Sequence, residues 1–356
     1  MGSKRATVGA AINLKAVFEP YVKSVDREMH KALTRKPDYA MYGMMRYFLG
    51  FADEKLRPLA VSEGKRFRPG LCLLIAESYG VAAQALPAAV SIELFHNFSL
   101  IHDDIEDCEN MRRGRPTVWK LWGVNHAINT GDGQLVLAHR QLAQIGTTDP
   151  ALAAKLMDFL PEQYLTVVEG QYLDFELTDL TIADPRMTRK AYFEMLTKKT
   201  AVLVGAATKT AGIVSGVSKQ ELDALWRYGL SLGLAYQLYD DAMSVWGSEA
   251  QTGKDRWGDI KTRKKTLPVL IAVEKLRGDD RARMIQLYDG KKPLKTAEIK
   301  EIRALFDRVD ALDVLRAHIK RHAQAAKRAA GKLTIAPSYK QTLVGIVDAL
   351  MPHISL

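Results

Sequence analysis

Carboxylates and arginines gather between residues 91 and 118, in an order that suggests phosphate chemistry. Asp103 and Asp107 are four residues apart, so on a helix their carboxylates lie one turn apart on the same face. Buried carboxylates of one sign are costly without a cation, and all-oxygen ligands favour Mg²⁺, which substrate phosphates usually complete. Arg112 and Arg113 follow, with guanidinium groups suited to bidentate phosphate binding. Each motif alone is more often a solvated helix face or a basic surface patch, but together they predict a magnesium and diphosphate site.

Two further stretches carry groups of the same kind. Gly64, Lys65 and Arg68 precede an apolar helix in which Pro69 suits the first turn, so the two cations would stand beside a helix start that attracts anions. Lys199 lies inside an otherwise apolar helical stretch, where a lysine needs an anionic partner. The sequence alone leaves both as weak anion-site candidates.

Helices are predicted to position all of these residues. Apolar residues recur with the 3.6-residue period throughout, and strand patterns are nearly absent. The predicted helices cover residues 11 to 32, 38 to 58, 67 to 80, 84 to 108, 118 to 143, 150 to 178, 186 to 213, 219 to 247, 265 to 276, 296 to 308, 311 to 330 and 337 to 350. We therefore expect an all-α, antiparallel helical bundle formed by one domain over residues 1–356, with residues 1–35 as a peripheral extension.

Composition limits the classes of partner. The 356 residues are 47% hydrophobic, which excludes general disorder, and no uninterrupted run of 18 apolar residues predicts a membrane span. The first residues fit neither a signal peptide nor the myristoylation pattern. Two cysteines suit a reducing cytoplasm. The net charge of +10 fits phosphorylated small molecules, and the absence of a recognised module argues against nucleic acid.

The motifs together resemble those of the short-chain trans-isoprenyl diphosphate synthases. That family has a DDxxD followed by RRGxPT, as at residues 103–107 and 112–117, and a GKRxRP, as at residues 64–69. It also has a GQxxD near Gln171 and Asp174, a KT pair like Lys199 and Thr200, and a KKTLP like residues 264–268. The resemblance covers about residues 60 to 270. It implies a bundle around a deep central cavity and condensation of isopentenyl diphosphate with allylic diphosphates.

The resemblance also implies a role for each matching residue. The Mg²⁺ ligands would be Asp103, Asp107 and Asp240. Isopentenyl diphosphate would meet Gly64, Lys65, Arg68, His96 and Arg113. The allylic diphosphate would meet Lys199 and Lys254, and the Thr200 hydroxyl would lie near the developing carbocation. Further substrate-binding positions would be Arg112, Gln237 and Lys264. Supporting positions would be Asp104, Gln171, Asp174, Asp241 and Asp259. The acidic helix ends at Asp103 and Asp240 would face each other across the cavity, and a homodimer is expected.

One position departs from the family. A second DDxxD is expected after Tyr239, but its last residue here is Ser244, which removes one carboxylate. Ser244 leaves two alternatives open. A class I terpene cyclase of the same fold has a serine four residues after its metal-binding Asp, although Ser248 then stands where a Glu is needed. The second alternative is not an enzyme: a non-catalytic partner subunit that only binds and modulates a synthase.

The helix that precedes the first acidic motif contains three candidates for the control of product length. Phe98 and Phe95 lie one and two turns before Asp103 on roughly the same face, with the small Ser99 next to Phe98. Ordinary core packing explains aromatic residues at such positions equally well. By resemblance, one bulky aromatic five residues before DDxxD is typical of synthases that stop at geranylgeranyl diphosphate, whereas two aromatic residues there are typical of farnesyl diphosphate synthases.

Overall fold

The computed structural model describes residues 12–59, 64–248 and 257–352. These residues fold almost entirely into helices, with one short hairpin and one isolated β-bridge between Ala52 and Pro58. Two compact units can be separated by their internal contacts. The first contains residues 1–164, 206–226 and 333–342, and the second contains residues 165–205, 227–332 and 343–356. The all-α prediction is therefore confirmed.

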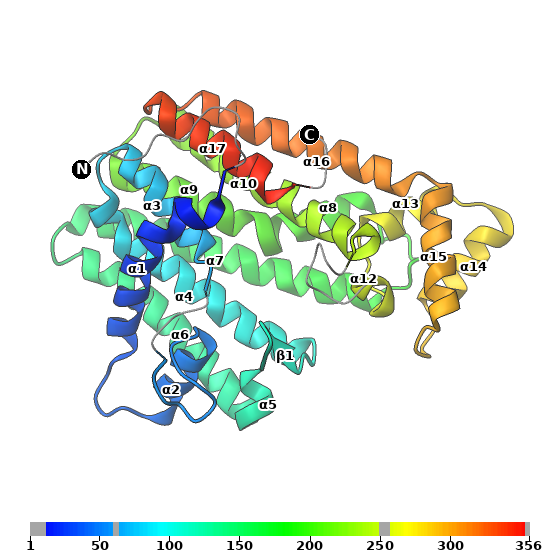
Figure 1. Cartoon of the computed structure of the whole chain (residues 1–356), viewed down its shortest axis with the longest axis horizontal. Coiled ribbons are helices and arrows are strands. Elements are labelled where there is room, and N and C mark those ends of the chain that lie inside the picture. The colour runs from blue at the N-terminus through cyan, green and yellow to red at the C-terminus, as the bar shows by residue number, and fades with distance from the viewer. Residues whose placement is uncertain (1–11, 60–63, 249–256, 353–356) are drawn as a thin grey trace. The chain divides into compact units, whose positions relative to one another are not determined.

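The first unit carries most of the N-terminal half of the chain (Figure 1). Its elements are α1 (Leu14–Leu33), α2 (Ala40–Phe48), α3 (Phe67–Ser78), α4 (Ala82–Glu106), β1 (Met111–Arg112), β2 (Arg115–Pro116), α5 (Val118–Trp122) and α6 (Val124–Ile145). Helix α4 packs against α3 and α6, and α1 packs against α3 and α4. Residues 88–95 of α4 are all buried, so the helix lies at the centre of this unit.

The second unit carries most of the C-terminal half of the chain, and seven elements of the described part of the chain lie wholly within it. They are α8 (Arg189–Leu196), the π-helical turn η1 (Thr197–Ala201), α12 (Gly258–Lys261), α13 (Leu267–Lys275), α14 (Gly278–Tyr288), α15 (Thr296–Arg308) and α16 (Ala311–Gly331). Helix α13 is buried over residues 267–272 and packs against α8, α14, α15 and α16. Four more helices have residues in both units, namely α7 (Pro150–Asp179), α9 (Val202–Ser215), α10 (Lys219–Trp246) and α17 (Pro337–Leu350).

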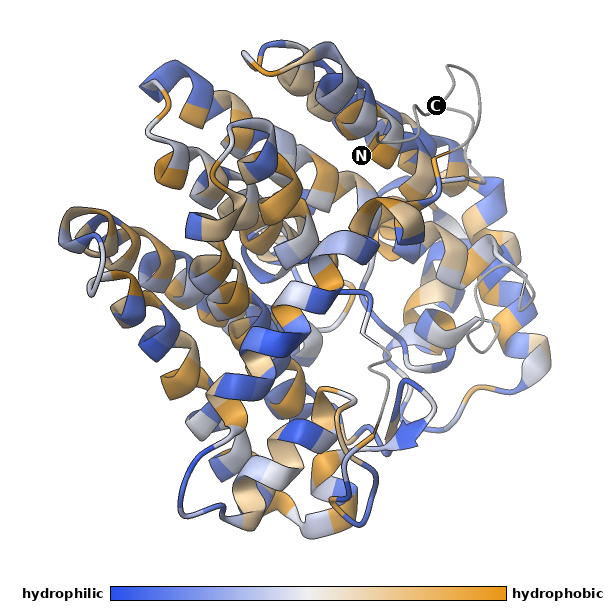
Figure 2. Ribbon diagram, turned by 60° about the vertical axis from the view of Figure 1, so that its left-hand side comes forward, coloured by the Kyte–Doolittle hydropathy of each residue, from blue (hydrophilic) through white to orange (hydrophobic). Residues whose placement is uncertain are grey.

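Surface helices follow the amphipathic pattern that the sequence indicates. Hydrophobic and hydrophilic residues alternate around individual helices in Figure 2, because each helix turns its apolar face inward. In α1, for example, Phe18, Val25 and Met29 are buried, while Lys23 and Lys31 remain exposed. The predicted helices 296 to 308 and 337 to 350 coincide with α15 and α17 for this reason.

The predicted helix 38 to 58 is wrong in its second half. Helix α2 ends at Phe48, and Gly50 follows with φ of 84°, a conformation that glycine adopts without strain. The Asp53 carboxylate then accepts hydrogen bonds from the backbone N–H groups of Lys55 and Arg57, at 2.9 Å each. This side chain offers the backbone a turn in place of the helix.

Other predicted elements need smaller corrections. The helix expected over 118 to 143 breaks at Gly123, where φ is 87°, and the one expected over 186 to 213 begins only at Arg189, after Thr188 caps it. Helix α14 was not predicted, and neither was the hairpin formed by β1 and β2. The hairpin is too short to show an alternating pattern, because each strand has two residues.

Candidate functional site

The first acidic motif lies at the C-terminal end of α4, within the first unit. Asp107 is the residue that caps α4, and its backbone N–H donates to the carbonyl of Asp103 at 2.9 Å. The two residues are therefore one helical turn apart, as the spacing predicts. The Asp103 side chain is 19% exposed, and its Oδ2 lies 3.6 Å from Nη2 of Arg112. Asp107 is exposed.

Asp104 is the buried member of the motif. Its side chain is 1% exposed, and Oδ1 accepts a 2.5 Å hydrogen bond from Nε of Arg112. Burial raises the pKa of the Asp104 carboxyl to about 6, because desolvation outweighs the attraction of Arg112. The second oxygen, Oδ2, is buried and accepts no hydrogen bond within the part of the chain that the structure describes. Arg112, which the sequence assigned to substrate, is thus bound to the acidic motif itself.

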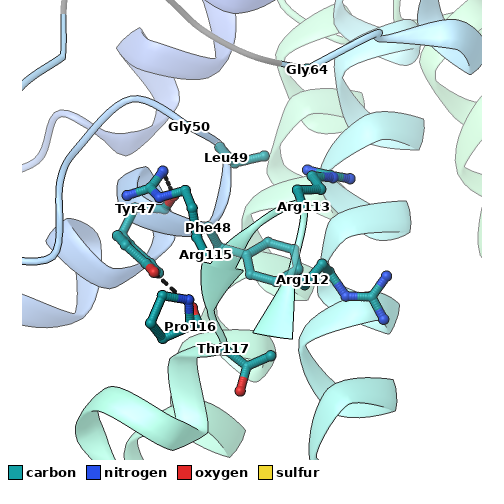
Figure 3. Close-up of a pocket in the computed structure, with 10 residues that line it drawn as sticks. All are labelled: Tyr47, Phe48, Leu49, Gly50, Gly64, Arg112, Arg113, Arg115, Pro116 and Thr117. Carbon is teal, nitrogen blue, oxygen red and sulfur yellow. Dashed lines mark hydrogen bonds between the residues drawn. The ribbon is translucent and has the colours of Figure 1, made fainter. Parts of the chain in front are cut away.

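The RRGR run forms a tight hairpin beside α4. Arg112 pairs with Arg115, and the two residues between them, Arg113 and Gly114, have φ values of 53° and 74°. A two-residue loop with positive φ at both positions matches the twist of an antiparallel hairpin. In Figure 3 the side chains of Arg112 and Arg113 extend to one side of the hairpin, while Arg115 lies against Tyr47 on the other. The pocket between them also includes Gly64 and Phe48.

Arg115 is a structural cation of this pocket. Its guanidinium stacks 4.0 Å above the Tyr47 ring and donates to the carbonyls of Tyr47 and Ala52. The Tyr47 hydroxyl in turn donates to the carbonyl of Pro116 at 2.7 Å. These bonds tie the hairpin to the end of α2, so the arginines are presented by a rigid turn.

The segment before α3 is anchored by a residue that the sequence analysis missed. Arg66 has a positive φ of 44° and a side chain that is 0% exposed. Its guanidinium donates to Asp26 Oδ1 at 2.8 Å, to Glu93 Oε1 at 3.3 Å and to the Leu49 carbonyl at 2.7 Å. The neighbouring Lys65 is exposed. The positive φ of Arg66 and its partners depend on the folded structure, so no signal in the sequence could have identified this role.

Arg68 and His96 are brought together within the same unit. Nη1 of Arg68 lies 3.0 Å from Nε2 of His96, and because arginine has only donors, the histidine nitrogen is the acceptor. Burial, followed by the charges of Arg68 and Arg113, lowers the pKa of His96 well below its ordinary value. His96 is therefore neutral at pH 7.

The aromatic residues before the acidic motif differ in their packing. Phe95 is 1% exposed and stacks on Tyr164, with ring centroids 3.9 Å apart. Phe98 is 8% exposed and makes an edge contact with His102 at 4.8 Å. The Ser99 hydroxyl donates to the carbonyl of His96. Phe95 is thus fixed in the core, whereas Phe98 is the less enclosed of the two.

In the second unit, Lys199 and Asp174 form an ion pair, with Nζ 2.5 Å from Oδ2. Lys199 and Thr200 belong to the π-helical turn η1, and both are partly exposed. In this turn the N–H of Val202 reaches the carbonyl of Thr197, five residues back. Single π-helical turns occur frequently at functional sites. Gln171 lies on α7, three residues before Asp174, and is also partly exposed.

The second acidic motif lies near the end of α10. Asp241 is buried, accepts a hydrogen bond from Gln237 Nε2 at 3.1 Å and another from the Tyr192 hydroxyl, and burial raises its pKa to about 6. Asp240 is partly exposed. Burial of the Lys264 ammonium would by itself lower its pKa. The negative charges of nearby carboxylates, with Asp259 first, outweigh the effect of burial and raise the pKa above its ordinary value.

Ser244 has a definite partner at the position where the family has a carboxylate. Its Oγ accepts a hydrogen bond from the backbone N–H of Asp259 at 3.1 Å. This bond joins α10 to the start of α12. Asp259 follows Gly258, the first residue of α12. Ser244 therefore fixes the backbone of another acidic residue.

The carboxylates of the first motif fit a magnesium ion by their chemistry. The donors at the end of α4 are oxygens, and the buried Oδ2 of Asp104 lies in the same turn without a hydrogen bond from any described residue. Within residues 12–59, 64–248 and 257–352 no three His, Cys, Asp or Glu side chains converge on one point as ready-made ligands. Mg²⁺ usually keeps several waters and takes one or two carboxylates plus substrate phosphates, so two aspartates suffice.

Two predictions extend beyond these observations. Lys254 lies outside the described residues. Asp103 belongs to the first unit and Asp240 to the second, so their convergence on one cavity stays a prediction.

In the described part of the chain, none of the helices combines the length and apolar character that a membrane crossing requires.

Comparisons with known proteins show the family to which the chain is similar. A family model described as polyprenyl synthetase matches residues 52–306. The chain is 39% identical over 240 residues to (2E,6E)-farnesyl diphosphate synthase of Mycobacterium bovis, which covers 66% of this chain and 64% of that protein. It is 34% identical over 308 residues to geranylgeranyl diphosphate synthase of Mycobacterium tuberculosis, which covers 86% of this chain and 84% of that one. The first match thus spans just under two thirds of its relative.

A solved structure supports the same conclusion. The crystal structure of polyprenyl synthetase from Streptomyces coelicolor A3(2) superposes with a TM-score of 0.85 and 28% identity, over 95% of this chain and 99% of that one. The architecture is therefore the all-α isoprenoid synthase fold. The chain belongs to the polyprenyl synthetase family.

Proposed function

We propose that the protein is a trans-prenyltransferase that condenses isopentenyl diphosphate with allylic diphosphates, in the presence of Mg²⁺. The observation that carries this proposal is the pairing of Arg68 with a neutral His96 near a hairpin that presents Arg112 and Arg113. Three fixed cations and a neutral donor suit a substrate diphosphate that remains intact. The names of the farnesyl and geranylgeranyl diphosphate synthases among its relatives support the same substrate class.

The allylic substrate would bind through a second set of groups. The Lys199 ammonium, together with Lys264 in its ring of carboxylates, would carry charge to the leaving diphosphate. Magnesium held by Asp103, Asp107 and Asp240 would act as a Lewis acid on that diphosphate. Asp174 would hold the Lys199 side chain in an extended position until a diphosphate competes for it.

The reaction breaks the bond between the allylic carbon and the diphosphate oxygen, and the electron pair leaves with the diphosphate. The isopentenyl double bond then attacks the allylic carbon, and a new carbon–carbon bond forms. One proton leaves the resulting cation and passes to the released diphosphate, so no side-chain base is needed. Lys199 and the hydroxyl of Thr200 would lie beside the developing charges, and their fixed positions lower the barrier.

Geranylgeranyl diphosphate is the proposed product, and farnesyl diphosphate is the alternative. Phe98, rather than Phe95, is the better candidate for the residue that stops the growing chain, because Phe95 is locked against Tyr164. Truncation of Phe98 should lengthen the product by at least one five-carbon unit, as measured by mass spectrometry. Phe95→Leu serves as the control for core packing. A Phe98→Ala enzyme with an unchanged product would contradict this assignment.

We further infer that the chain forms a homodimer. The side chains of Leu165, Val168, Tyr172 and Phe175 recur every three or four residues along α7 and are between 36% and 61% exposed. An exposed apolar stripe of this kind marks a protein interface. Sedimentation velocity of the purified protein tests this, and a monomer at micromolar concentration would contradict it.

Incubation of the purified protein with Mg²⁺ tests the main proposal and its alternatives together. Isopentenyl diphosphate plus dimethylallyl, geranyl or farnesyl diphosphate should give longer diphosphates. Geranylgeranyl diphosphate alone should give no hydrocarbon, whereas hydrocarbon release would identify a terpene cyclase. Absence of any turnover would favour the non-catalytic partner subunit.

A further inference from the structure

Two glycines of the second unit contact the π-helical turn η1 from two different helices. Gly170 belongs to α7, and Gly233 belongs to α10. Both are buried, and neither has a positive φ, so conformational freedom does not explain them. Glycine in a helix interior costs about 1 kcal/mol relative to alanine. A reason for these glycines must therefore come from the space around them.

That space is taken by the backbone of η1. A Cβ atom built on Gly170 would lie 2.6 Å from the carbonyl carbon of Lys198 and 2.6 Å from Cα of Lys199, and it would also clash with the Lys199 nitrogen. A Cβ on Gly233 would lie 2.8 Å from Cα of Ala201. Real Cβ atoms essentially never approach within 3.0 Å. Because the obstacles are backbone atoms, they cannot be relieved by a rotamer change.

Two ion pairs join α7 to the same turn. Glu169, next to Gly170, pairs with Lys198 at 2.8 Å, and Asp174, one turn further on, pairs with Lys199 at 2.5 Å. The turn is thus held by backbone contact at Gly170 and by a charge on either side of it. Gly233 closes the turn from α10.

We propose that Gly170 and Gly233 are positioning residues that together fix η1, and so set where the Lys199 ammonium and the Thr200 hydroxyl stand. The assignment rests on the proposed function in one respect, that Lys199 binds an allylic diphosphate. A π-helical turn is intrinsically less stable than an α-helical one and persists only where its surroundings hold it. A displacement of a binding group by about 1 Å can cost as much as 100-fold in rate.

Hydrogen exchange of the backbone amides in residues 197–202 tests the clamp without reference to activity. Gly170→Ala and Gly233→Ala should each raise the exchange rate of these amides at least 10-fold. Gly212→Ala is the matched control, because its Cβ would meet Leu225 Cδ1 at 2.5 Å in the first unit, three turns of α9 beyond η1. Gly331→Ala, with nothing within 4 Å, is the uncrowded control. Equal exchange in Gly170→Ala and Gly212→Ala would overturn the proposal.

A double-mutant cycle tests the link to Lys199. Gly170→Ala should weaken binding of a non-reactive allylic thiodiphosphate at least 10-fold and leave the KM for isopentenyl diphosphate within twofold. In a Lys199→Ala background the same substitution should have less than a twofold effect, because groups that act through one another are not additive. Additive losses, or equal losses for both substrates, would show a merely structural role.

Two further outcomes are defined in advance. If Gly170→Ala does not fold, the cycle is run with Gly233→Ala, whose closest contact is the milder one. Condensation by the wild-type protein tests the proposed function separately. If the wild-type protein binds no allylic thiodiphosphate, the proposed function fails, while the exchange measurement still supports or overturns the clamp.

Discussion

Replacement of Arg66 by methionine should be among the most destabilising single changes in the first unit. The change removes a fully buried guanidinium that serves three acceptors from three parts of the chain, namely Asp26 in α1, Glu93 in α4 and the carbonyl after α2. Glu93 is 5% exposed and Asp26 18%, so both carboxylates would be left with little water. Loss of one partner from such a buried pair costs about 3–5 kcal/mol.

The size of the effect can be measured by thermal unfolding. A loss of this magnitude should lower Tm by roughly 4–7 °C in a chain of this length. The matched control is Lys65→Met, the same substitution at the adjacent, exposed residue, which should cost less than about 0.5 kcal/mol. Both variants should weaken isopentenyl diphosphate binding, but only Arg66→Met should have a clearly lower Tm than the wild type.

A second variant separates charge from packing. Glu93→Met in the Arg66→Met background removes the carboxylate that is otherwise stranded, and it should restore part of the lost stability. The reasoning would be refuted if Arg66→Met unfolded at the same temperature as Lys65→Met. It would also be refuted if the second substitution lowered the Tm further by its full individual cost.

Two other predictions concern single contacts. Ser244→Ala removes the acceptor for the Asp259 N–H, so it should lower the free energy of unfolding by about 1 kcal/mol and raise the Mg²⁺ concentration needed for half-maximal activity. Ser244→Thr should keep both quantities near wild type. An unchanged Mg²⁺ requirement in the alanine variant would contradict this role. Burial, followed by the charges of Arg321 and His318, lowers the pKa of His322 to about 4. Below pH 6.5 this imidazole therefore binds a proton in the unfolded chain but stays neutral in the folded chain. Stability should therefore fall as the pH drops from 6.5 towards 4, by up to about 2 kcal/mol at pH 5 from this residue, and His322→Gln should remove that part of the fall. Equal Tm differences between wild type and His322→Gln at pH 7 and pH 5 would disprove this.

The elements that sequence reasoning located are those fixed by local periodicity. Helices α10, α15 and α17 begin and end within one residue of their predicted limits, because their apolar residues alone define a buried face. The segment after α2 was misjudged, since its course depends on a turn built by the Asp53 carboxylate. The positive φ of Arg66 likewise depends on tertiary contacts, with Asp26, Glu93 and the Leu49 carbonyl, that no local pattern contains.

The candidate site divides in the same way. Residue type and spacing were enough to single out Asp103 and Asp107 one turn apart, and Lys199 as a lysine that needs an anion. Partners were not predictable, because they depend on how the chain turns back between the paired residues. Arg112 binds Asp104, and Ser244 binds the backbone of Asp259. Neither pairing follows from the family motifs, which describe residues singly.

The Arg68–His96 contact determines which tautomer the imidazole adopts. Since Nε2 accepts from the guanidinium and the ring is neutral, the single ring proton resides on Nδ1. The side of the ring that faces away from Arg68 is therefore an N–H donor that carries no formal charge. Its hydrogen-bonding capacity stays constant across the neutral pH range, and an asparagine amide, whose nitrogen occupies the place of Nδ1, is the substitution best suited to imitate it.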